Sequence, residues 1–198
     1  WKGNPFLAPE KIQKATLSAS YKKTSFTMTY SYSTDFFSSI SEPFQSNKII
    51  SIPKNIGSQH HLLFSLYQEL NWGKGCQTTI TPNLSYIENK GTVLEGSELH
   101  LNRWQYSLTM QNYFRLPWQL KGELTAVYNS RRLAGINEIA KSSGGIDLGL
   151  QRIFLNNRLT ATLSFTDIFH TQRWDSESHL PNLDLYAYGN SESQQVKL

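Results

Sequence analysis

Apolar and polar residues alternate with a period of two along much of this chain, and this alternation is the feature that most constrains its fold. It is clearest between residues 103 and 130. One side of the first stretch carries Trp104, Tyr106, Leu108 and Met110, and the other carries Gln105, Ser107, Thr109 and Gln111. After residues 116–117 the pattern restarts, with Leu120, Gly122, Leu124, Ala126 and Tyr128 on the apolar side. A period of two predicts β-strands, so the two stretches predict a hairpin.

The same alternation predicts an all-β chain in which helices are scarce. We expect complete strands at residues 12–21, 24–33, 60–70, 77–88, 103–115, 118–130, 145–154 and 158–169, and the start of a further strand over 183–198. Short connections at residues 22–23, 71–76, 116–117 and 155–157 alternate with long ones at 34–59, 89–102, 131–144 and 170–182. This rhythm predicts an antiparallel up-and-down meander. Transmembrane β-barrels have the same asymmetry, with short periplasmic turns and long extracellular loops.

Membrane and soluble sheets share this period, so the composition of the polar side has to decide between them. Three polar sides carry no charge: Thr79, Thr81, Asn83 and Ser85; Gln105, Ser107, Thr109 and Gln111; and Thr160, Thr162, Ser164 and Thr166. The surface of a soluble domain is typically roughly a quarter to a third charged, whereas charged residues make up only 17% of this chain. The pattern favours a wet, enclosed barrel interior on the polar side and lipid on the apolar side.

The aromatic residues fall into two groups that suggest the two interfaces of a membrane. Near the short connections lie Tyr21, Trp72, Phe114, Trp118 and Phe154, and nearer the long ones lie Tyr32, Tyr86, Trp104, Tyr128 and Phe169. The separation of Trp104 and Phe114 corresponds to about 23 Å of membrane normal for a tilted strand. The apolar band of such barrels is about 25 Å tall. Outside the membrane, a soluble β-sandwich binding module remains the alternative.

Composition excludes several other classes of protein. The net charge of +4 is spread along the chain, with adjacent basic residues only at 22–23 and 131–132, so we expect no nucleic-acid partner. The single cysteine, Cys76, excludes an internal disulfide and a multi-cysteine zinc site. No apolar run approaches the roughly 18 residues of a membrane-spanning helix. Because the chain lacks an initial Met and ends without a turn, we expect residues 1–198 to be a partial barrel domain of a longer protein.

The titratable residues offer weak candidates for chemistry. Asp167 and His170 lie three residues apart at a predicted strand end, where such a pair is ordinary. The chain has no G-x-S-x-G turn for a nucleophilic serine. His60 and His61 are strand neighbours, so they point to opposite faces and do not ligate one metal ion together. We therefore predict no catalytic, cofactor-binding or metal-binding residues and no enzymatic activity.

Aromatic residues of the long connections are the best candidates for ligand contact, because glycans stack on such rings and chelates pack against them. They are Phe36, Phe37, Phe44 and Trp174. The cations Arg131, Arg132 and Lys141 have two interpretations. They bind lipopolysaccharide phosphates, or they are solvated loop charges.

Two segments resemble a known family. The stretch GNPFLAPEKIQKATLSASY, residues 3–21, resembles a GNP-x-L-x-PE segment in the barrel of TonB-dependent receptors, in particular the Bacteroidota outer-membrane barrel family. The stretch GGIDLGLQRIFLNNRLTATLSFTDIFHTQRW, residues 144–174, looks like the late hairpin of that barrel, with its Leu-Asn-Asn turn and D-I-F-x-T ending. Together the two segments cover about a quarter of the chain.

The resemblance implies a barrel of about 22 strands around a plug, located in the outer membrane of a Gram-negative bacterium. Such a receptor imports an iron chelate, cobalamin, a glycan or a peptide, and the present residues would be a segment of its wall. The implied partners are outer-membrane lipid, lipopolysaccharide, the plug of the same chain, the TonB complex and a surface lipoprotein, and no cofactor is implied. The plug and the closing strand would lie outside residues 1–198. A porin-like channel or a small structural outer-membrane barrel remains the alternative within the membrane.

Overall fold

The computed structural model describes residues 3–44, 48–92, 98–136, 138–156, 158–180, 183–189 and 192–198. These residues form antiparallel strands arranged in two sheets and include no helix. Within these ranges no segment is a helix with the length and apolar character that crossing a membrane requires. The prediction of an all-β antiparallel meander is confirmed.

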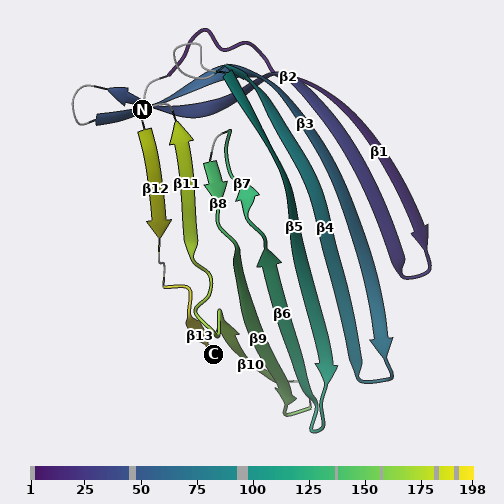
Figure 1. Ribbon diagram of the computed structural model, residues 1–198. Helices are drawn as coiled ribbons and strands as arrows, with labels where there is room; N and C mark the ends of the chain where they lie inside the picture. Colours follow the sequence, from purple (N-terminus) through teal and green to yellow (C-terminus); the bar gives the residue numbers. More distant parts are fainter. Residues whose placement is uncertain are drawn as a thin grey trace.

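The larger sheet has nine strands in the order β1-β2-β3-β4-β5-β6-β9-β10-β13 (Figure 1). The strands are β1 (Lys11–Tyr21), β2 (Thr24–Phe44), β3 (Lys48–Trp72), β4 (Cys76–Thr92), β5 (Glu98–Arg115), β6 (Leu120–Asn129), β9 (Ser143–Phe154), β10 (Leu159–Thr166) and β13 (Gln195–Lys197). Each strand pairs with the next one in this order, so the sheet is a meander without a crossover. The sheet is not closed, because β1 and β13 stand at its two ends.

Tight turns join the strands at one end of the sheet, which we call the turn end. Lys22 has a φ of 52° between β1 and β2, and Trp118 and Gln119 have φ values of 59° and 58° before β6. Positive φ at two consecutive turn residues gives the primed turns whose twist matches that of a hairpin. The prediction that a strand begins at residue 118 is therefore wrong, because Trp118 and Gln119 form the turn and β6 begins at Leu120.

At the opposite end, two of the predicted long connections are largely extensions of the strands. Strands β2 and β3 continue as a ladder to Phe44↔Lys48, and β4 and β5 continue to Thr92↔Glu98. The expectation of open segments at residues 34–59 and 89–102 is therefore wrong for most of their length. The alternation there is irregular, with bulges between Thr34 and Phe37, and pairing with the neighbouring strand stabilises the extended chain where periodicity does not reveal it.

A second, four-stranded sheet has the order β12-β11-β8-β7. Its strands are β7 (Arg132–Leu133), β8 (Glu138–Ala140), β11 (Trp174–Leu180) and β12 (Leu183–Gly189). It is built from the predicted connections at 131–144 and 170–182 and from the first part of the expected strand at 183–198. That expected strand is in fact two strands, β12 and β13, which belong to different sheets.

The register places the apolar side chains of successive strands on one face of the large sheet. Leu108 pairs with Pro82 on one side and with Tyr128 on the other. Farther along, Leu148 pairs with Leu124, and Leu150 pairs with Leu163. The described strands place no second layer over this face, so the face is a single exposed apolar surface.

The opposite face is polar from strand to strand. The uncharged residues of β4 and β5 are direct partners in the pairs Thr79↔Gln111, Thr81↔Thr109, Asn83↔Ser107 and Ser85↔Gln105. In β10, Thr162 pairs with Gln151 on the same face. The predicted separation of polar and apolar residues is therefore a property of the whole sheet, and the two sides differ as the two sides of a barrel wall do.

A few polar groups interrupt the apolar face near the turn end, and they satisfy one another. The indole Nε1 of Trp72 donates to Thr78 Oγ1 at 3.0 Å, and Thr78 Oγ1 donates to Asn112 Oδ1 at 2.7 Å. Thr78 and Asn112 are both buried. Hydrogen bonding within this chain of contacts removes most of the cost of placing polar groups on an apolar surface.

Candidate functional site

The hairpin formed by the distal parts of β2 and β3 bends away from the sheet and reaches toward β11 and β12 (Figure 1). Asp35 has a φ of 55° at the bulge, and Gly57 has a φ of 152° opposite it. Gly57 pairs with Gly91 of β4, and a Cβ on Gly91 would lie 1.8 Å from the carbonyl oxygen of Ile56. Only glycine permits this approach of two backbones, so the bend depends on these two positions.

The bent hairpin encloses a small hydrophobic core. Ile40, Ile56 and Ile136 are almost completely buried together, and Phe36 and Leu99 pack against them. We call the distal β2–β3 hairpin and the four-stranded sheet the cap. Ile136 lies between β7 and β8, so the core joins the hairpin to the second sheet.

The cap is attached to the polar face of the large sheet. The side chain of Asn89 is 1% exposed and donates to the carbonyl oxygen of Ile136 at 3.4 Å. The backbone N–H of Leu133 donates to Gln105 Oε1 at 3.0 Å. Because Asn89 and Gln105 both belong to the polar face, the cap lies over the end of that face and leaves the apolar face free.

Hydrogen bonds of the Asn55 side chain hold residues 3–10 against the bent hairpin. The Asn55 side chain accepts a hydrogen bond from the Ala8 N–H at 2.8 Å and donates to the Ala8 carbonyl at 2.9 Å and to the Asp35 carbonyl at 2.6 Å. Asn4 donates to the carbonyl of Pro53 at 3.0 Å. The GNPFLAPE segment therefore has a structural role in holding the cap.

A hollow of about 380 Å³ lies where the cap meets the polar face. Its lining includes His61, Asn83, Ser85, Gln105, Asn129 and Arg132. Amide and hydroxyl groups offer both donors and acceptors, and the guanidinium of Arg132 adds a donor for anionic groups. Arg103 lies two residues before Gln105 in β5, on the same face of the sheet. Its buried Nε has no hydrogen-bond partner in the described part of the chain. This arrangement suits a polar or anionic ligand.

Comparison with protein families identifies the chain. The model of the outer membrane protein beta-barrel family matches residues 1–198. The chain belongs to this family. No match was found among curated proteins or among solved structures.

Membership of the outer membrane protein beta-barrel family places the protein in the bacterial outer membrane. In such barrels the apolar side of each strand faces lipid and the polar side faces the interior. The exposed apolar face of the large sheet is therefore the membrane-facing one, and the hollow beneath the cap opens on the interior.

Eight of the ten aromatic residues predicted for the membrane interfaces project from the apolar face, as their strand register shows: Tyr21, Tyr32, Trp72, Tyr86, Trp104, Phe114, Tyr128 and Phe154. Trp118 and Phe169 lie instead in turns. Tyr30 and Tyr106 were not predicted as interface aromatics, although they share the strand parity of Tyr32 and Trp104. Contact of all these rings with the membrane interface stays a prediction.

The residues predicted to contact a ligand have different environments. Phe36 packs against the core of the cap, whereas Phe37 is 47% exposed and Trp174, at the start of β11, is 51% exposed. The side chain of Phe44 lies outside the part that the structure describes. Of the four, Phe37 and Trp174 have rings available to a ligand, and their role stays a prediction.

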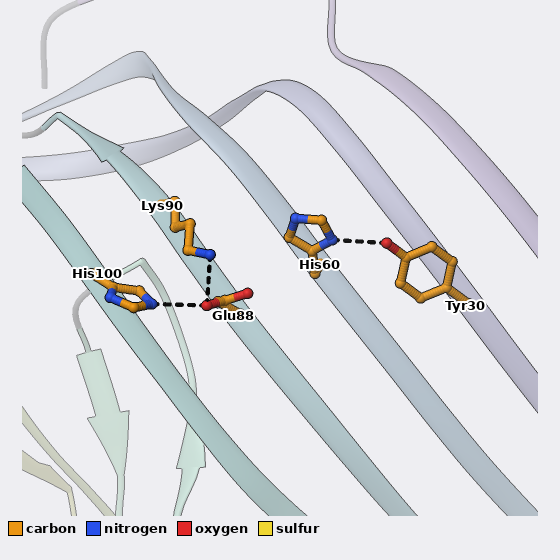
Figure 2. A network of polar contacts seen from close by, with 5 residues as sticks. All are labelled: Tyr30, His60, Glu88, Lys90 and His100. Carbon is orange, nitrogen blue, oxygen red and sulfur yellow. Dashed lines mark hydrogen bonds and ion pairs between the residues drawn. The ribbon is translucent and has the colours of Figure 1, made fainter.

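A polar cluster lies on the apolar-face side of the strands between the aromatic residues and the cap (Figure 2). Glu88 Oε1 contacts the Lys90 ammonium at 2.9 Å and His100 Nε2 at 2.8 Å. These hydrogen bonds lower the pKa of the Glu88 carboxyl below its ordinary value, and the bond to Lys90 has a larger effect than the bond to His100. His60 Nδ1 lies 2.8 Å from the Tyr30 hydroxyl, and its ring stacks on Tyr32.

Of the residues considered for chemistry, His60 and His61 lie on opposite faces and Asp167 has a structural role, whereas the buried Nδ1 of His170 has no hydrogen-bond partner in the described residues. His60 pairs with Tyr32 on one face and His61 pairs with Ser31 on the other, as predicted for strand neighbours. Asp167 is fully buried, and its carboxylate accepts hydrogen bonds from the backbone N–H groups of Thr171 and Gln172 and from the Ser193 hydroxyl. It therefore organises the turn that follows β10. No three His, Cys, Asp or Glu residues in the described ranges gather closely enough to hold a metal ion.

Proposed function

We propose that this chain is part of the barrel wall of a TonB-dependent outer-membrane receptor that imports a polar or anionic nutrient. The observation that supports this most directly is the hollow beneath the cap, where hydrogen-bonding groups of the polar face converge with Arg132. A capped interior that offers donors and acceptors is the arrangement needed to capture a scarce ligand before transport.

In this proposal the cap faces the outside of the cell and the turn end faces the periplasm. Support comes from the asymmetry of the connections, because outer-membrane barrels have short periplasmic turns and longer extracellular segments. The similarity of residues 3–21 and 144–174 to TonB-dependent receptors supports the choice of transporter class. The nutrient remains within the classes that the resemblance implies: an iron chelate, cobalamin, a glycan or a peptide.

The test is nutrient uptake by cells that carry the complete gene product. We expect uptake that requires an active TonB complex and falls when Arg132→Gln weakens the hollow. The matched control is Lys121→Gln, which removes a charge from the polar face near the turn end. Uptake that needs no TonB complex, together with unselective passage of small solutes, would contradict the proposal and favour a porin-like channel.

A further inference from the structure

The apolar face contains a groove of about 440 Å³ that crosses the middle strands of the sheet. Two ring pairs form its sides. Phe26 and Phe64 lie on one side with their centroids 6.4 Å apart, and Tyr106 and Tyr128 lie on the other at 5.8 Å. Pro82 of β4 lies between them. The lining is almost entirely apolar, so the groove is shaped to receive a hydrocarbon chain.

Pro82 explains why the groove is at this position. The β3–β4 ladder pairs Ser65 with Asn83 and resumes at Gln68 with Ile80. Pro82 falls in the gap, and it has no N–H to donate to β3. Its small ring also rises less far from the sheet than the side chains of Phe64 and Tyr106 beside it. The groove therefore follows from the sequence of β4.

Directly toward the cap from this groove, the same face changes from apolar to charged. Tyr86 and Trp104 come first, with ring centroids 5.1 Å apart. Beyond them Lys90 and His100 are direct cross-strand partners, and both contact Glu88 (Figure 2). Their side chains are 50% and 57% exposed, so the Lys90 ammonium keeps donors that Glu88 does not use, and the His100 imidazole is accessible beside it.

The distance between the groove and the pair Lys90 and His100 matches the length of an amphipathic lipid. From Leu84 in the groove to Lys90 the chain advances about 20 Å along the strand, or about 14 Å of membrane normal at the usual tilt. The aromatic pair lies between them, at the level where such rings mark the boundary of the hydrocarbon. An acyl chain lying in the groove would place its headgroup beside Lys90 and His100.

We propose that this strip is a binding site for a phosphorylated glycolipid of the outer leaflet, with one acyl chain in the groove and a phosphate monoester on Lys90 and His100. A monoester carries about −1.5 to −2 charges and three acceptor oxygens, which suits the Lys90 ammonium with an imidazole beside it better than the single charge of a phosphodiester does. Glu88 holds the Lys90 ammonium and the His100 imidazole side by side and leaves their outer edges to the phosphate. The site rests on the orientation given under Proposed function, with the cap outside the cell.

The experiment measures lipid binding to the complete protein, refolded in detergent from a denatured state so that it carries no cell lipid. Native mass spectrometry compares bisphosphorylated lipid A, chemically dephosphorylated lipid A, and phosphatidylglycerol. We expect one tightly held lipid A, with affinity about tenfold above that of the other two lipids. Because the assay involves no transport, its result does not depend on whether the protein imports a nutrient.

Variants divide the site into its two parts. The double variant Lys90→Gln/His100→Asn should weaken lipid A about tenfold and leave the dephosphorylated lipid unchanged. Leu84→Trp should fill the groove and weaken both forms of lipid A. The matched controls are Lys14→Gln, which removes a charge from the polar face, and Leu17→Trp, which enlarges a side chain of the apolar face outside the groove.

Folding of each variant is checked by heat-modifiable gel mobility, and Tyr106→Ala replaces Leu84→Trp if the tryptophan variant does not fold. Equal affinity for the three lipids would overturn the proposal. So would unchanged lipid A binding in the double variant, or in the folded groove variant. Binding of phosphatidylglycerol equal to that of lipid A would show that Lys90 and His100 do not recognise the phosphate monoester.

Discussion

Gly57 and Gly91 show how much of the cap depends on single residues. Their backbones meet where the β2–β3 hairpin leaves the sheet, and a Cβ on Gly57 would lie 2.2 Å from the carbonyl oxygen of Lys90. The nearest atoms are backbone atoms, which cannot rotate away as a side chain would. The bend and the covering of the polar face are therefore consequences of two missing side chains.

We predict that Gly91→Ala destabilises the cap by about 1–3 kcal/mol, the usual cost of forcing an extra group into a packed site. The cap should become sensitive to protease added to intact cells. Gly149→Ala is the matched control, because its Cβ would meet the nearest atom at 3.9 Å, an ordinary contact. Equal protease resistance of the Gly91→Ala variant and the parent protein would contradict the close approach of β3 and β4.

The Glu88 cluster predicts a dependence of stability on pH. Since Lys90 and His100 lower the folded-state pKa of Glu88, its contribution to stability is present above the unfolded-state pKa. That contribution is lost as the pH falls through the lowered folded-state pKa. Glu88→Gln should therefore lower the thermal midpoint at pH 7, only slightly because both partners, Lys90 and His100, are about half exposed, and the difference should vanish in strong acid.

The measurement is the temperature of the heat-modifiable transition across a pH series, with Glu123→Gln as a control acid from the polar face. If the difference in transition temperature between the parent protein and Glu88→Gln grew as the pH fell, the result would contradict the prediction. It would show that the carboxylate is not stabilised by Lys90 and His100.

At the scale of elements, the cap is a small folded unit with its own core, added to the end of the barrel wall. Ile40 comes from β2, Ile56 from β3, and Ile136 from the segment between β7 and β8. These three side chains connect strands that belong to different sheets. In contrast, the large sheet has exposed apolar side chains and is held mainly by its ladders and by the lipid around it.

We predict a graded response at Ile40. Ile40→Val should destabilise the cap by about 0.5–1.5 kcal/mol and Ile40→Ala by about 2–5 kcal/mol, because the larger truncation leaves a larger cavity. Hydrogen exchange of the backbone amides in the distal β2–β3 hairpin is the measurement. The amides of β4 from Cys76 to Tyr86 and of β5 from Trp104 to Phe114 lie away from the cap, so they serve as the internal control and should exchange unchanged.

An equal response to the two substitutions would indicate that Ile40 is not packed in a core. Faster exchange throughout the sheet would indicate that the cap and the wall unfold together.

For the whole molecule, the decisive property is which face of the sheet meets the hydrocarbon. Backbone groups inside a bilayer have to be paired within the protein, so a sheet in the membrane has to close on itself or on further strands. In the described residues the sheet is open at β1 and β13. We expect both edges to be paired in the assembled barrel.

Neighbouring residues on β5 test the assignment of the two faces. Met110→Arg places a cation on the apolar face and should destabilise the barrel by about 2–4 kcal/mol near the membrane midplane. Thr109→Arg, one position away on the polar face, should have little effect. Unfolding in guanidinium chloride, followed by tryptophan fluorescence in lipid vesicles, measures both. The opposite order of stability would mean that the polar face meets lipid.

The sequence by itself determined the strands near the turn end, the separation of the two faces and the class of membrane protein. These follow from period-two alternation, which is local and recurs from strand to strand, and from the stretches of uncharged residues on the polar side of β4, β5 and β10. Tyr30 and Tyr106 could also have been found in this way, since they share the parity of residues that were identified.

Only the tertiary structure decided the cap, the hollow beneath it and the groove in the apolar face. In the segment from Thr34 to Gly57 the bulges break the alternation, so its strands exist because a partner strand and a shared core stabilise them. Ile136 meets Ile40 across almost a hundred residues of chain, and Lys90 meets His100 through the register of two strands. Contacts of this kind depend on how distant segments pair, and no local pattern in the sequence records that pairing.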